Sequence, residues 1–133
     1  MVVNCKALNL KVHLFSHRIE INTHEMYRRV EELGKLPKTA APSPADFVQS
    51  FGLVIENSKD VLFISMSSQV SSTYQNALIA ARKFPPGRVT VIDSLNVTAG
   101  TAMSNLLAAQ AAAEGRSALF ISDKFHLLRD EIQ

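Results

Sequence analysis

Apolar side chains along this chain fall into short runs that alternate with longer helical patterns. Residues 8–14 alternate apolar and polar positions, which is typical of a half-buried strand. Two runs rich in apolar residues, 61–66 and 88–92, are typical of buried strands. Apolar positions three or four residues apart predict helices over residues 22–33, 43–55, 74–81, 98–114 and 120–132. This alternation predicts an α/β domain in three layers, with a mostly parallel sheet and helices on both faces.

Capping residues mark where several of these helices begin and end. Asn22, with Glu25 three residues later, forms a capping-box pattern, and Gly34 ends the same helix. Residues 35–44 contain three prolines, which exclude regular structure and fix an extended path. Ser43 then serves as the N-cap of the next helix, and Pro44 occupies its first position. The predicted buried face of that helix comprises Phe47, Val48, Phe51, Val54 and Ile55.

Hydroxyl side chains crowd between the run at 61–66 and the helix that starts near Tyr74. The stretch contains six of them: Ser65, Ser67, Ser68, Ser71, Ser72 and Thr73. In an open α/β sheet, ligands bind at the carboxyl ends of the strands, where helix N-termini direct unpaired N–H groups into the crevice. Hydroxyls and helix N-termini together suit a carboxylate or phosphate. The competing interpretation, favoured on this stretch alone, is that Ser71 only caps the helix.

Composition and charge exclude several classes of function. The 133 residues carry 14 basic and 12 acidic side chains, and this net charge of +2 is too balanced to indicate a nucleic-acid partner. No apolar stretch reaches the length of a membrane span, and no signal peptide is recognisable. The single cysteine, Cys5, excludes an internal disulfide. We therefore expect a cytoplasmic protein. The sequence also lacks the phosphate-loop, dinucleotide, zinc-protease and nucleophile-elbow motifs, so neither a metal nor a cofactor is expected.

Three segments together resemble the DegV family. Residues 36–47, LPKTAAPSPADF, resemble the proline-rich first motif of that family, LPKTSQPSP. Residues 64–77, ISMSSQVSSTYQNA, resemble its second motif, SSxLSGTYQSA. Residues 91–94, VIDS, and the small-residue helix after them resemble a third segment. The resemblance covers roughly residues 8–132, and the spacing of the first two motifs makes it specific.

The resemblance implies a function in lipid binding. Members of the DegV family bind long-chain fatty acids and present them to a separate fatty-acid kinase, without being catalytic themselves. By position in the two motifs, the resemblance implies that Thr39 and Ser71 hold the carboxylate. Neighbouring hydroxyls at the predicted strand ends are further candidates for ligand binding: Ser43, Ser68, Ser72 and Ser94. The tail then needs apolar walls, and each buried methylene contributes roughly 0.8 kcal/mol to binding.

The chain also departs from the family pattern. Ala40 and Ala41 stand where the family has Ser-Gln, and Ser72 stands where it has glycine. The first strand of the family, with its DSTxDL loop, and its second domain, which closes the acyl tunnel, are not recognisable. We therefore interpret residues 1–133 as a partial DegV-like N-terminal domain. Apolar walls left open favour a homodimer and weak lipid binding by this chain alone.

Two alternatives from other functional classes stay open. The serine-rich loop could serve a hydrolase or a subunit for acyl or phosphoryl transfer, but such chemistry needs a general base near Ser71, and the sequence indicates none. The chain could instead be a truncated remnant that folds and binds nothing.

Overall fold

The computed structural model describes residues 2–4, 23–34, 41–57 and 60–132. In chain order the elements are β1 (Val2–Asn4), α1 (Thr23–Leu33), α2 (Pro44–Ile55), β2 (Val61–Ser65), α3 (Thr73–Ala81), β3 (Val89–Asp93), α4 (Ala99–Ala113) and α5 (Ala118–Ile132). The strand predicted over residues 8–14 and the capping residue Asn22 lie outside the described residues.

The strands of the described residues form one sheet in the order β1-β2-β3. β2 and β3 are parallel, in agreement with the predicted parallel sheet, and the structure places Ser65 opposite Asp93 at their carboxyl ends. β1 pairs antiparallel with the other edge of β2, with Val2 opposite Phe63. This strand was not predicted, because three residues are too few to give a periodic signal.

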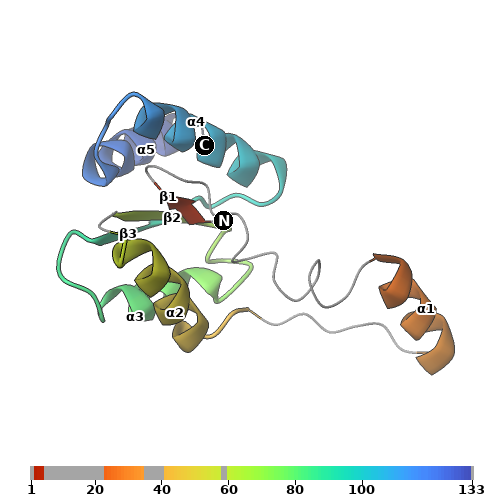
Figure 1. Ribbon diagram of the computed structural model, residues 1–133. Coiled ribbons are helices and arrows are strands. Elements are labelled where there is room, and N and C mark those ends of the chain that lie inside the picture. The colour runs from red at the N-terminus through yellow and green to blue at the C-terminus, as the bar shows by residue number, and fades with distance from the viewer. Residues whose placement is uncertain (1, 5–22, 35–40, 58–59, 133) are drawn as a thin grey trace.

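Helices cover both faces of this sheet, which confirms the predicted α/β class. In Figure 1, α2 and α3 lie below the sheet, α4 and α5 lie above it, and α1 stands apart from these layers. α2 leads into the start of β2 and α3 leaves from its end, so both helices run opposite to the strand direction. α2 and α3 are therefore parallel to each other. Among the described residues, no helix is both long and apolar enough to cross a membrane.

Aromatic side chains dominate the core on the α2–α3 side. Phe47 and Phe51 of α2 and Phe63 of β2 are fully buried, with ring centroids 5.1 to 5.9 Å apart. Ala77 and Ala80 of α3 complete this cluster, and their small side chains let α3 approach the sheet closely. The predicted buried face of α2 is confirmed, with Val48 and Ile55 only partly buried.

Aliphatic and small side chains form the core on the α4–α5 side. Leu62 and Ile64 alternate with Val61 and Phe63 along β2, so they face the opposite layer. Four residues of the two helices pack against them and against Ile92: Ala108, Ala112, Ala118 and Ile121. The prediction of a small-residue helix packed on the sheet is confirmed.

Several predicted boundaries are also confirmed. Ser43 caps α2 in a full capping box with Asp46, and Pro44 occupies the first turn. Gly34 and Gly115 follow α1 and α4 with positive φ angles of 61° and 83°, a backbone conformation that favours glycine.

Candidate functional site at the carboxyl edge of the sheet

The carboxyl ends of β2 and β3 form one edge of the molecule, and three helices begin there. α3 and α4 follow these two strands directly, and α2 runs parallel to α3, so all three N-termini lie at the right-hand end of the sheet in Figure 1. The Asn76 side-chain amide, in the first turn of α3, donates a 2.7 Å hydrogen bond to the Pro42 carbonyl just before α2. This bond links the end of the first motif to the second. The edge therefore gathers helix dipoles that favour an anion.

Asp93 holds the two loops of this edge together. Its Oδ1 accepts a hydrogen bond from the Ser68 backbone N–H at 3.1 Å and another from the Leu95 N–H at 3.0 Å. The Ser67 N–H also donates to the Asn96 carbonyl at 2.8 Å. The loop after β2 is thereby attached to the loop after β3. Asp93 is nearly buried, and its role depends on the pairing of β2 with β3, which the sequence does not show.

Ser71 lies just before α3 and is partly buried. Its Oγ accepts a 3.2 Å hydrogen bond from the Thr73 N–H and lies 2.8 Å from the Thr73 hydroxyl. The N-cap position of α3 is Ser72, so the interpretation that Ser71 caps this helix is wrong, and Ser71 instead forms a local turn with Thr73. A hydroxyl has one donor and two acceptor positions, so these bonds leave room for a ligand contact. The role of Ser71 in ligand binding stays a prediction.

Ser72 and Ser43 precede the first residues of α3 and α2. Ser72 is exposed, and its side chain forms no capping hydrogen bond in the described structure. The Ser43 hydroxyl forms two contacts with Asp46 in the first turn of α2. Its Oγ accepts from the Asp46 N–H at 3.3 Å and lies 2.8 Å from Asp46 Oδ2. The Ser43 hydroxyl therefore bonds within the start of α2, whereas Ser72 is exposed to solvent beside the N-terminus of α3.

Ser94 is fully buried and organises the loop between β3 and α4. Its Oγ accepts from the Asn96 N–H at 3.1 Å and lies 3.2 Å from the Thr101 hydroxyl. The Asn96 side chain in turn lies over Gly100, where an added Cβ would lie 2.5 Å from Asn96 Oδ1. Only glycine therefore fits at position 100 with this loop conformation.

The structure gathers Ser43, Ser68, Ser71, Ser72 and Ser94 at one edge, in the loops and helix starts described above. Thr39 lies outside the described residues. A further hydroxyl also ends β2: the Ser65 Oγ is buried and has no hydrogen-bond partner among the described residues. By strand alternation with Val61 and Phe63, its side chain faces the α2–α3 layer. In the part of the chain that the structure describes, no group of His, Cys, Asp or Glu is placed to hold a metal ion.

Comparison with known proteins identifies the family. A family model described as an uncharacterised protein of the DegV family matches residues 7–133. The chain belongs to the DegV family. A DegV domain-containing protein from Deinococcus radiodurans is 34% identical over 104 residues, which are 78% of this chain and 37% of that protein.

Solved structures of the DegV family share the fold. A DegV family protein from Thermus thermophilus, whose structure concerns fatty acid binding, is 34% identical with a TM-score of 0.72. The match covers 85% of this chain and 40% of that one. A DegV lipid binding protein from Thermotoga maritima is 27% identical with a TM-score of 0.72, over 81% of this chain and 38% of that one. The chain thus spans about two fifths of the length of the DegV relatives it matches.

Proposed function

We propose that this DegV chain is a lipid-binding module without catalytic activity of its own. It binds a long-chain fatty acid, with the carboxylate at the carboxyl edge of β2 and β3, and presents it in the cytoplasm to a separate fatty-acid kinase. Fatty acid binding by the Thermus thermophilus relative supports the ligand class. The observation that carries the proposal for this chain is the convergence of three helix N-termini and several hydroxyls on one edge.

The chemistry of this edge suits a carboxylate held without a fixed positive charge. The N-termini of α3 and α4 each contribute unpaired N–H groups and roughly half a positive elementary charge. The N-terminus of α2 is already capped by Ser43 and the Asp46 carboxylate. Ser71 and Ser72 add hydroxyl donors beside the start of α3, and the hydrogen bond between Asn76 and Pro42 holds the described end of the Thr39 motif against the same helix. We propose Thr39 and Ser71 as the two direct ligands of the carboxylate, with the other hydroxyls shaping the edge.

We further propose that the chain associates with itself through the outer face of α4. This helix carries no charged residue between Ala99 and Ala113, yet Met103, Leu106 and Leu107 are each more than half exposed. A face of this kind favours burial against an apolar surface, and an isologous contact between two copies provides one.

Substitution of Ser71 tests the carboxylate site. Ser71→Ala should weaken binding of oleate by about 1–3 kcal/mol, the usual scale for a hydrogen bond to a charged group, while the lipid-free protein loses less stability than that. The measurement is isothermal titration calorimetry together with thermal unfolding. Thr39→Ala should weaken binding to a similar extent.

Ser117→Ala is the matched control for this experiment. The Ser117 Oγ accepts a 3.2 Å hydrogen bond from the Phe120 N–H at the start of α5, so it supports a helix start as Ser71 does. It lies at the end of α4, away from the carboxyl edge, and its loss should leave oleate affinity unchanged. Equal loss of affinity in both variants, no oleate binding by the parent chain, or ester hydrolysis that Ser71→Ala abolishes would each contradict the proposal.

A further inference from the structure

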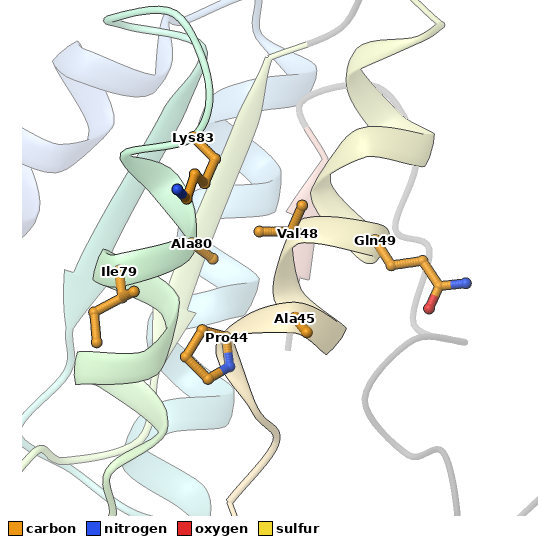
Figure 2. A pocket seen from close by; sticks show the side chains of 7 residues that line it. All are labelled: Pro44, Ala45, Val48, Gln49, Ile79, Ala80 and Lys83. Carbon is orange, nitrogen blue, oxygen red and sulfur yellow. The ribbon is translucent and has the colours of Figure 1, made fainter.

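An open groove of about 550 Å³ runs between α2 and α3, from the first turn of α2 to the turn after α3. α2 contributes four lining residues and α3 with the turn after it contributes three: Pro44, Ala45, Val48, Gln49, Ile79, Ala80 and Lys83 (Figure 2). In Figure 2, Val48 points from α2 toward α3, and Gln49 points away from the groove. The walls facing the hollow are therefore almost entirely apolar.

Small side chains on the floor make this groove hollow. Ala80 is fully buried beneath it, and Pro44 and Ala45 leave the space above them open. Ile79, 49% exposed, forms the rim on the α3 side. Lys83 lies at the far end, just past the C-terminus of α3, and among the described residues it is the only charged one in the lining. An apolar hollow with one cation at its end is complementary to an apolar chain that carries a single anionic head group.

The dimensions limit the occupant. The lining segment of α2, residues 44–49, spans about 7.5 Å along the helix axis at about 1.5 Å per residue. That length suits a short acyl chain and not the full tail of a long-chain fatty acid. A stable protein partner buries about 800 Å² on each side, more than seven residues around one hollow provide.

We propose that this groove is a second binding site, which takes a short-chain or medium-chain carboxylate with its tail between α2 and α3 and its carboxylate on the Lys83 ammonium. The groove begins at Pro44, the first residue of α2 at the carboxyl edge, but its charged end is Lys83, past the C-terminus of α3 and so at the opposite end of that helix from Ser71. It does not depend on the hydroxyls of Ser71 or Thr39, so the two sites can succeed or fail independently.

Titration of the ¹⁵N-labelled chain with octanoate, followed by NMR, tests this site. Saturable shift changes are expected at backbone amides of residues 45–49 and 79–83. Octanoate should bind more tightly than butanoate, because each buried methylene raises affinity by up to about fourfold. Octylammonium should bind more weakly than octanoate. Shift changes without saturation, changes located elsewhere, or equal affinity for octylammonium would overturn the proposal.

Two pairs of variants sharpen the test. Lys83→Gln should weaken octanoate binding about two- to five-fold, the scale of an exposed ion pair, whereas Lys124→Gln on α5 should not. Ala45→Leu should fill the groove and abolish the saturable changes, whereas Ala113→Leu, at a likewise exposed position of α4, should leave them intact. Ser71→Ala should also leave them intact. Unchanged binding in Ala45→Leu would show that octanoate does not occupy the groove.

Discussion

The two helical layers pack on the same three-stranded sheet in different ways. On one face, Phe47, Phe51 and Phe63 form an interlocked aromatic cluster, and Phe84 extends it, with its ring centroid 6.3 Å from that of Phe51. On the other face, alanines of α4 and α5 bring the helix backbones close to the sheet. Aromatic rings bury more apolar area per residue than alanine, so we infer that the α2–α3 layer contributes more of the free energy of folding.

The solvent-facing surfaces of the two layers also differ, and here the α4–α5 layer is the more apolar one. Among the residues whose burial the structure describes, α4 and α5 expose six large apolar ones: Met103, Leu106, Leu107, Leu119, Phe120 and Leu127. α2 and α3 expose only two such residues among those described, Leu53 and Ile79, and the latter borders the groove. The layer with the smaller inward side chains thus carries the larger apolar outer surface. Folding stability and association are expected to depend on different layers.

The same substitution in each layer tests the difference in packing, and this is the largest effect expected. Phe51→Ala should lower the free energy of unfolding by about 3–5 kcal/mol, because it removes a fully buried ring with three aromatic neighbours. Phe125→Ala on α5 should cost about 1–2 kcal/mol, because that ring is only partly buried.

Denaturant unfolding of both variants measures these costs. Phe51→Leu keeps most of the apolar volume and should recover a large part of the loss. Equal costs for Phe51→Ala and Phe125→Ala would show that the two layers contribute alike, despite their different composition.

A charge on the outer surface of α4 tests the second half of the comparison. Leu106 is 65% exposed, and Leu106→Glu should shift the chain from dimer to monomer, because a carboxylate on each copy would be buried in the interface. Leu53→Glu is the matched control, since Leu53 is 55% exposed on α2, in the other layer. Light scattering coupled to size exclusion measures the molecular mass. A parent chain that is already monomeric, or a control variant that dissociates equally, would contradict an interface on α4.

Much of the fold could be predicted because most helices and strands have local sequence signals. The pair Ser43–Pro44 predicts the start of α2, and the apolar run of residues 61–66 predicts β2. β1 gave no such signal, because its place at the sheet edge depends on pairing with β2 and not on its own three residues. Phe120 forms part of the apolar pattern of α5 yet is 42% exposed, because the sheet has room for only one side of that helix.

The candidate site could be predicted only in part. The hydroxyl-rich loop and its position after β2 follow from sequence order, and the resemblance to the DegV family adds Thr39. The sequence does not indicate a role for Asn76 or Asp93 at this edge, because each bonds to a partner at least 25 residues away in the chain. The unpartnered hydroxyl of Ser65 is likewise visible only in three dimensions, since in sequence it is one serine among several.

Two buried serines at the ends of the parallel strands provide the finest test of the comparison between layers. Ser65 ends β2 and faces the α2–α3 layer, whereas Ser94 follows β3 and bonds to Thr101 of α4. Both are fully buried, but only Ser94 has hydrogen-bond partners among the described residues. Ser94→Ala should therefore lower the free energy of unfolding by about 1–3 kcal/mol, because it leaves the Asn96 N–H without its acceptor.

Ser65→Ala removes a buried polar group that forms no hydrogen bond, so it should leave the free energy of unfolding unchanged or raise it by up to about 1 kcal/mol. Both variants are measured without lipid, by denaturant unfolding at one pH. A loss in Ser65→Ala equal to that in Ser94→Ala would mean that the Ser65 hydroxyl is hydrogen-bonded in solution. If Ser65→Ala instead loses no stability, the Ser65 hydroxyl is a buried donor at the carboxyl edge that faces α2 and α3. Such a donor is free to bond to a ligand at little cost to the stability of the fold.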